Sequence, residues 1–255
     1  MKSETVDLEI RDGVAWIVLN RPGALNALSL RMVAQFAAHV KSLRGRRDVR
    51  IVVTRGAGRA FCAGSDIREL AGVPARAAAV AERRHAQVFA LLGTLSQPTI
   101  AMVHGYALGG GLGLALYHDF RFAAADAVLG LPEVELGWTP PWAMGRLAHT
   151  AGHAWASWLS LGCVRISGTR AAALGLVHET VPAKALEARV VAFAARLAHM
   201  APGALARTKK LLNQMSPLLS PKWDARASNA FESCYAEPRA QKAVAAFARR
   251  KGKRA

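Results

Sequence analysis

The sequence is poor in cysteine, and its three cysteines are far apart. Cys62, Cys163 and Cys234 are odd in number and form no Cys-x-x-Cys pair, which argues against a disulfide or zinc framework and for a reducing compartment. The eight histidines show no His-Glu-x-x-His spacing, so no metal site is expected. The sequence therefore predicts a cytoplasmic protein without a bound metal.

Acidic residues are scarce. Asp and Glu number 17 against 34 Lys and Arg, and the net charge is +17. The bases are spread along the chain, with clusters at 44–50 and 249–254. The excess fits either a solvated surface or attraction for an anionic ligand. Aromatics interleaved with bases, as in RNA-binding modules, are absent, so nucleic-acid recognition is not expected.

The N-terminus has no basic segment followed by an apolar one, because Glu4, Asp7 and Glu9 interrupt it. No signal peptide is therefore predicted. Residues 99–117 carry no Asp, Glu, Lys or Arg and reach the length of a membrane span. Five glycines and His104 within this segment favour a buried strand, turn and helix instead, and we expect a soluble protein.

The chain has 255 residues, 52% of them apolar, which is enough for one large core. Ser29 is a candidate N-cap for a helix over 30–43. Strand and helix patterns alternate up to about residue 142, which indicates an α/β fold with a largely parallel sheet. The predicted elements are a hairpin (6–10 and 14–19), strands (49–54, 98–103, 119–123 and 127–129) and helices (30–43, 75–95, 183–200, 203–215 and 221–250). We predict an α/β core over 1–190 and a helical region over 191–255.

Three adjacent glycines follow the 98–103 strand and lead into a predicted helix over 112–117. The run reads HGYALGGGLGLAL from His104. Glycines at such a junction expose backbone N–H groups, and the helix start adds unpaired donors and a partial positive charge. The junction suits an oxygen that becomes negative during a reaction. A tight turn with close helix–strand packing explains the same residues.

Other glycine-rich sites are a poorer match. A dinucleotide-binding fingerprint would need glycine at Leu114 or Leu116, and no Gly-Lys-Ser/Thr follows the run. Ser65 lacks the elbow of a nucleophilic serine, because Ala63 occupies the first glycine position.

Four further segments accompany the glycine run, in order along nearly the whole chain. They read NRPGALNAL (20–28), RGAGRAFCAGSDIR (55–68), GLPEVELG (130–137) and ALGLVHETVP (173–182). Together the five segments resemble the crotonase family, the enoyl-CoA hydratase/isomerase superfamily. The resemblance implies a ββα spiral core with a helical C-terminal trimerisation region, and an acyl-CoA substrate. It also implies a homotrimer or a hexamer, and no cofactor, because CoA is part of the substrate.

The resemblance also implies roles for individual residues. The N–H groups of Ser65 and Gly110 would stabilise a thioester enolate, and Glu133 would move the proton. Hydratases of the family carry a second glutamate two residues after the glycine triplet, where this chain has Gly113. This departure puts isomerisation slightly ahead of hydration. Contacts with CoA are expected from Ala24, Leu25, Ser65, Asp66, Ile67, Arg68, Gly110, Phe247 and Arg250.

Several alternatives stay open at this point. Glu133 follows Pro132 and also fits a helix-start carboxylate without a catalytic role. Trp138 and Trp142 fit either the acyl pocket or the core. Thioester hydrolases and dehalogenases of the family need an Asp where this chain has Pro141. A lyase acting on an aromatic or branched acyl-CoA, and a non-catalytic basic binding protein, are the remaining alternatives.

Overall fold

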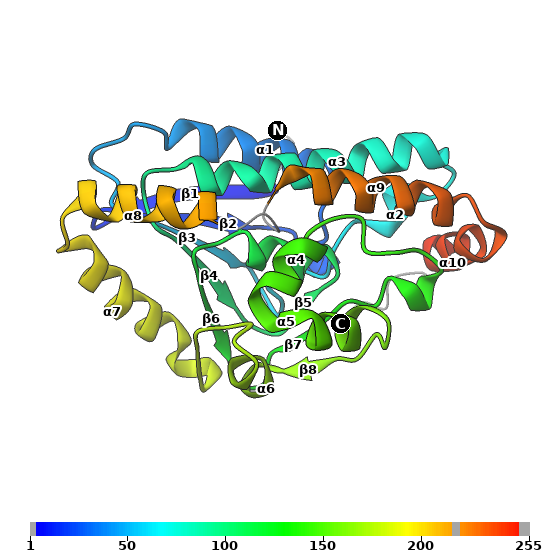
Figure 1. The fold of residues 1–255 in the computed structure, drawn as a ribbon. Coiled ribbons are helices and arrows are strands. Elements are labelled where there is room, and N and C mark those ends of the chain that lie inside the picture. Colours follow the sequence, from blue (N-terminus) through cyan, green and yellow to red (C-terminus); the bar gives the residue numbers. More distant parts are fainter. Residues whose placement is uncertain (1–3, 216–219, 250–255) are drawn as a thin grey trace.

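The computed structural model describes residues 4–215 and 220–249, and two sheets form its centre (Figure 1). The larger sheet has the strand order β1-β2-β3-β4-β6-β9, and the smaller has the order β5-β7-β8. Only the β1–β2 and β7–β8 pairs are antiparallel. The strands are β1 (Val6–Arg11), β2 (Val14–Leu19), β3 (Ile51–Gly56), β4 (Thr99–Val103), β5 (Tyr106–Leu108), β6 (Phe120–Ala124), β7 (Val128–Gly130), β8 (Ile166–Ser167) and β9 (Glu179–Val181).

The predicted hairpin is confirmed. Asp12 and Gly13 both have positive φ, 51° and 72°, as a two-residue turn between right-twisted strands requires. Every residue of β2 is buried, while β1 becomes exposed toward its end. The hairpin therefore places β1 at the outer edge, where it covers the first buried strand of the sheet.

Helices surround the sheets, and α1, α3 and α9 lie along the upper side in Figure 1. Ser29 caps α1 as predicted, because its side chain accepts a hydrogen bond from Met32 N. The predicted 75–95 helix is α3 followed by a 3-10 turn over Leu91–Thr94. The helices are α1 (Leu30–Ser42), α2 (Ile67–Leu70), α3 (Ala75–Ala90), α4 (Gly110–Leu116), α5 (Met144–Ser160), α6 (Gly168–Ala173), α7 (Leu186–Ala198), α8 (Pro202–Met215), α9 (Pro221–Tyr235) and α10 (Pro238–Arg249).

The sequence patterns did not reveal α5, β8 or β9. Gly152 interrupts α5 with a φ of 79° and breaks its periodicity. The two strands span two and three residues, too few to show an alternating pattern. Pro238 divides the predicted 221–250 helical region into α9 and α10.

Two hydrophobic cores hold these elements. The main core packs the larger sheet against α1, α3, α4 and α7. The second joins Leu70 of α2 and Ala78 of α3 to Phe231, Tyr235 and Val244 of the last two helices. The boundary proposed at residue 190 falls inside α7, and the division into 1–190 and 191–255 stays a prediction.

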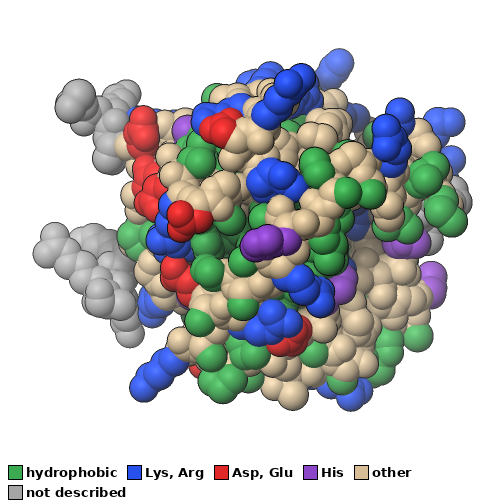
Figure 2. All heavy atoms as spheres, turned by 90° about the vertical axis from the view of Figure 1, so that its left-hand side faces the viewer, with side chains coloured by type: hydrophobic (Ala, Val, Ile, Leu, Met, Phe, Trp, Pro, Cys, Tyr) green, Lys and Arg blue, Asp and Glu red, His purple; other side chains and the backbone are tan. Residues whose placement is uncertain are grey.

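Basic side chains are distributed over the surface. The face in Figure 2 shows Lys and Arg at many separate points, with hydrophobic and acidic side chains between them. Within residues 4–215 and 220–249, no helix is both long and apolar enough to span a bilayer.

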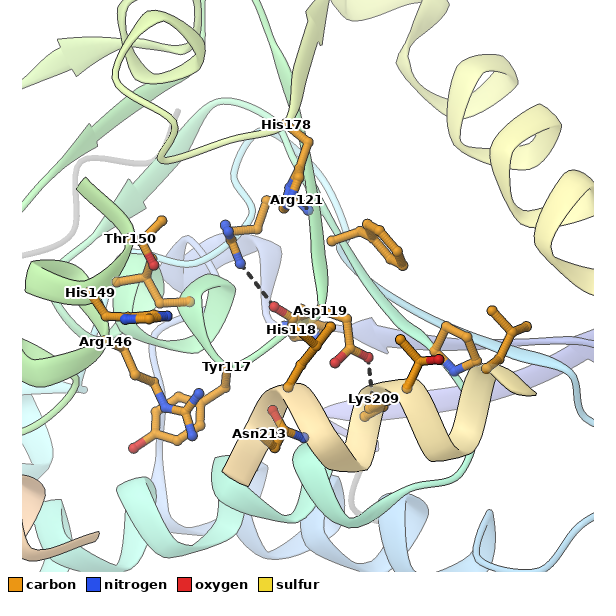
Figure 3. Close-up of a pocket in the computed structure, with 16 residues that line it drawn as sticks. Tyr117, His118, Asp119, Arg121, Arg146, His149, Thr150, His178, Lys209 and Asn213 are labelled. Atoms are coloured by element: carbon orange, nitrogen blue, oxygen red, sulfur yellow. Dashed lines mark hydrogen bonds and ion pairs between the residues drawn. The ribbon is translucent and has the colours of Figure 1, made fainter. Parts of the chain in front are cut away.

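A cavity of about 410 Å³ lies between α8 and the strand ends around Asp119 (Figure 3). Lys209 reaches from α8 to Asp119, with 2.7 Å between Nζ and Oδ2, and donates to the carbonyls of Leu92 and Gln97. Arg121 donates to the carbonyls of Leu176 and His118. These charges are satisfied within the chain, so the polar lining attaches α8 to the sheet.

Lys209→Met should lower the free energy of unfolding by about 3 kcal/mol, because it removes the buried cation that pairs with Asp119 and one donor to each of two carbonyls. Lys210→Met removes the same charge from the exposed neighbouring position and should change stability by less than about 0.5 kcal/mol. Urea unfolding of both variants checks this, and equal effects would contradict the structural role of Lys209.

Candidate active site

Two loops meet the start of α4 at the centre of the site. Cys62 N donates to Tyr106 O (2.9 Å), and Leu108 N donates to Cys62 O (3.1 Å). On the other side, Leu28 N donates to Gly64 O (2.8 Å). Residues 62–65 are thus held between the 20–28 loop and β5, which brings the predicted motifs together.

Glycine is required at this junction because the backbones approach too closely for a side chain. A Cβ on Gly111 would lie 2.0 Å from Cys62 O. A Cβ on Gly64, where φ is 96°, would lie 2.9 Å from Leu108 O and 3.2 Å from Gly110 N. Ser65 follows Gly64 and Gly110 precedes Gly111, so each predicted donor, Ser65 N or Gly110 N, adjoins one of these glycines.

Neither of these two N–H groups donates to any group of the described chain. Gly110 is the first residue of α4, where the N–H has no partner within the helix and carries part of the helix-dipole charge. Both predicted donors are therefore unpaired within the described residues.

Glu133 lies directly over the glycine run. A Cβ on Gly109 would lie 2.7 Å from Glu133 Oε1, and only 6% of the glutamate is exposed. Its Oε2 is buried without a hydrogen-bond partner in the described chain. Burial raises the pKa of Glu133 to about 8, and the negative charge of Glu82 adds to the rise. The group can therefore hold or release a proton near neutral pH.

Trp142 occupies the space beside Gly113. A Cβ on Gly113 would lie 2.5 Å from the indole ring, and one on Gly110 would lie 2.9 Å from it. The indole is 3% exposed and packs with the rings of Phe89 and Tyr117. Trp142 therefore belongs to the core and packs behind Gly110 and Gly113. Trp138 lines the cavity that also contains Ser65 and Glu133, and it packs on Phe231.

The analysis of motifs missed Glu82 and His85, which α3 brings into the same region. Trp142 Nε1 donates to Glu82 Oε2 at 2.8 Å, and His85 Nδ1 lies 3.3 Å from the same oxygen. Burial acts to raise the pKa of Glu82, but His85 and hydrogen bonds from Trp142 and Ser65 lower it overall. A signal was present, because Glu82, His85 and Phe89 follow Ala78 at helical spacing on a buried face.

The predicted CoA loop is locked by Asn26. Leu25 and Asn26 have positive φ, 51° and 56°, and Asn26 is fully buried. Its side chain accepts from Arg21 N and donates to the carbonyls of Ala57 and Ala60. This fixes the position of the neighbouring Ala24 and Leu25.

The remaining predicted CoA contacts lie at one end of this arrangement. Asp66 caps α2 and pairs with Arg21 at 2.8 Å, and Ile67 and Arg68 follow it in that helix. Phe247 is 37% exposed on α10, which packs against α2. Arg250 lies outside the described residues.

Ser65, Gly110, Glu82 and Glu133 line one cavity of about 50 Å³. Its other walls are apolar, with Ile67, Leu70, Leu136 and Trp138 among them. The cavity thus brings together the two residues with unpaired N–H groups and two carboxylates whose pKa values are shifted in opposite directions.

Comparisons with known proteins identify the family of this chain. Residues 9–254 match the model of the enoyl-CoA hydratase/isomerase family. A probable enoyl-CoA hydratase of Mycobacterium bovis is 36% identical over 220 residues, 84% of this chain and 83% of that protein. A hydroxycinnamoyl-CoA hydratase-lyase of Pseudomonas fluorescens is 31% identical over 212 residues, 81% and 77% of the two chains.

A solved enoyl-CoA hydratase/isomerase from Mycobacterium paratuberculosis superposes with a TM-score of 0.87 at 25% identity, covering 96% of this chain and 98% of that one. The chain belongs to the enoyl-CoA hydratase/isomerase family, and the predicted crotonase fold is confirmed. It is therefore an acyl-CoA enzyme of that family.

Relative to the wild type, the Glu133→Gln variant should become progressively more stable as the pH rises. Between the ordinary pKa of 4.5 and the raised value of about 8, the unfolded chain releases the Glu133 proton while the folded chain keeps it. The wild type therefore loses stability over this window, and the glutamine variant does not. Melting temperatures at pH 5 and pH 8.5 should show a gap that grows by about 3 °C or more, and a constant gap would contradict the raised pKa.

Gly113→Ala should lower the free energy of unfolding by about 2 kcal/mol, because the added methyl group overpacks Trp142. Gly203→Ala is the matched control in α8, since its new Cβ would meet only the flexible end of Arg207, at 3.5 Å. It should be neutral or slightly stabilising. Chemical denaturation of both variants measures the difference, and a stable Gly113→Ala protein would show that Trp142 does not fill this space.

Proposed function

We propose that this protein moves a proton on an enoyl-CoA thioester, with double-bond isomerisation ahead of hydration. The observation that carries the proposal is the carboxylate of Glu133, whose Oε2 is buried without a partner in the described chain, in one cavity with two residues whose N–H groups are unpaired there. The position that would hold a second glutamate in a hydratase is Gly113, and the Trp142 ring fills the space beside it.

In the proposed reaction the thioester oxygen accepts from Ser65 N–H and Gly110 N–H. Glu133 takes a proton from the carbon next to the thioester of a 3-enoyl-CoA. The electron pair spreads over the thioester oxygen and the double bond, and the two donors stabilise this enolate. Glu133 then returns the proton to the fourth carbon, which yields the 2-enoyl-CoA with unchanged composition.

The raised pKa of Glu133 suits this step. The stronger the conjugate base, the smaller the cost of removing a weakly acidic C–H proton. The apolar walls from Ile67, Leu70 and Leu136 keep the carboxylate dry. CoA enters as part of the substrate, so the proposed reaction uses no cofactor.

The likeness to a hydratase-lyase makes carbon–carbon cleavage the second candidate. It uses the same enolate and a single carboxylate, and it is distinguished by an aldehyde and a shortened acyl-CoA among the products. A cytoplasmic homotrimer or hexamer, expected from the resemblance, remains part of the proposal.

Glu133→Gln should lower kcat on 3-enoyl-CoA by about 10²- to 10⁴-fold and leave KM nearly unchanged, because proton transfer is lost while binding remains. In the wild type kcat/KM should rise with pH toward a plateau above about 8, since the base must be ionised. Ultraviolet assays and mass spectrometry on 3-enoyl, 2-enoyl and hydroxyacyl-CoA esters measure both.

Glu135→Gln is the matched control. Glu135 is exposed and pairs with Arg165 on the surface at 2.9 Å, so its loss should change kcat less than twofold. Full turnover by Glu133→Gln on every accepted ester would eliminate the proposed role of Glu133.

A further inference from the structure

A second carboxylate lines the active-site cavity although the glycine run provides none. Glu82 comes from α3, and only 1% of it is exposed. It lines the 50 Å³ cavity together with Ser65, Gly110 and Glu133. The chain thus brings a buried acid to this site from a different element than the one that carries Gly113.

The contacts of Glu82 hold it in one orientation. A tryptophan N–H can only donate, so the 2.8 Å bond from Trp142 Nε1 calls for an acceptor at Glu82 Oε2. His85 Nδ1 approaches the same oxygen at 3.3 Å. The carboxylate is therefore held as an acceptor, and this oxygen is not available to activate a water.

Trp142 connects Glu82 to the glycine run. Its ring lies where side chains on Gly110 and Gly113 would project, next to one of the two N–H donors. Without the bond to Glu82, the indole N–H would be buried with no acceptor, at a cost of about 1–3 kcal/mol. The Glu82–Trp142 pair thus supports the glycine run from behind at Gly110 and Gly113.

We propose that Glu82 is a positioning residue of the active site, which fixes the Trp142 indole over the glycine run and places a constant negative charge beside Glu133. This proposal rests on the proposed role of Glu133 as the proton carrier. Glu82 acts through these two neighbours and does not itself exchange a proton with the substrate.

The charge of Glu82 is set by groups on several elements. His85 shares its helix, Tyr235 of α9 is close enough for the Glu82 charge to act on it, and Glu133 shares the cavity. Asp66 and Glu69 line a second cavity together with Glu82. The negative charge of Glu82 favours the protonated form of both Tyr235 and Glu133, and of these two Glu133 is the proposed proton carrier.

Glu82→Gln tests the proposal, because it keeps an acceptor for Trp142 and removes the charge. The rise of kcat/KM with pH that reports the ionisation of Glu133, here called the pH limb, should move to lower pH by about one unit. Glu135→Gln is the control. It removes an equal charge from an exposed position two residues after Glu133 and should leave the pH limb in place. A limb that stays in place in Glu82→Gln would overturn the proposal.

A direct titration separates positioning from a merely structural role. The infrared difference between the wild type and Glu133→Gln isolates the carboxyl C=O band of protonated Glu133. When both proteins also carry Glu82→Gln, this band should disappear at a lower pH than it does without that substitution. If Glu82→Gln does not fold, Trp142→Phe keeps the charge and removes the donor. It should lower kcat about tenfold with the limb unmoved, and unchanged kcat would overturn the proposal.

The results also distinguish this proposal from the proposed function. A fully active Glu133→Gln variant removes both. If Glu133→Gln is inactive and the pH limb of Glu82→Gln stays in place, only the proposal for Glu82 is contradicted. An inactive Glu133→Gln variant with a shifted limb in Glu82→Gln supports both.

Discussion

The site depends on one close approach between two backbones. Gly111 lies so near the Cys62 carbonyl that no side chain fits between them, and Gly64 meets the start of α4 in the same way. These contacts hold together two segments more than forty residues apart, and the unpaired N–H groups of Ser65 and Gly110 adjoin the two glycines. A larger residue at either glycine would separate the donors before it changed any side-chain chemistry.

Because the donors are fixed by the main chain, the side chains around them carry the specificity. Glu133 sits over Gly109 in a dry pocket, and burial makes its proton exchangeable near neutral pH. Glu82 stays ionised in the same cavity because His85 and Trp142 stabilise its charge. The pKa values of two carboxylates in one cavity are driven apart, which fits the two proposed roles, proton transfer by Glu133 and fixed electrostatics by Glu82.

Local signals in the sequence predicted the alternating α/β elements, whereas the crotonase fold and the assignment of Ser65 and Gly110 as donors came from the resemblance to the family. The Asp12-Gly13 hairpin, the Ser29 cap and the glycine run depend on neighbouring residues in the chain. The Glu82–Trp142 pair spans 60 residues, and no spacing rule indicates that a helix glutamate will meet a distant indole. Short strands such as β8 and β9 also depend on tertiary pairing.

At Gly113 the glutamate of a hydratase is absent, and a different side chain fills the space beside the glycine. From the sequence alone the glycine indicates only a lost carboxylate. In the structure the space beside it is filled by Trp142, and the indole brings a buried acid, Glu82, to the wall of the site. Restoring a glutamate at 113 would therefore displace the indole and leave Glu82 without its donor. The glycine, the tryptophan and the glutamate form one unit, and single substitutions within it should not be additive.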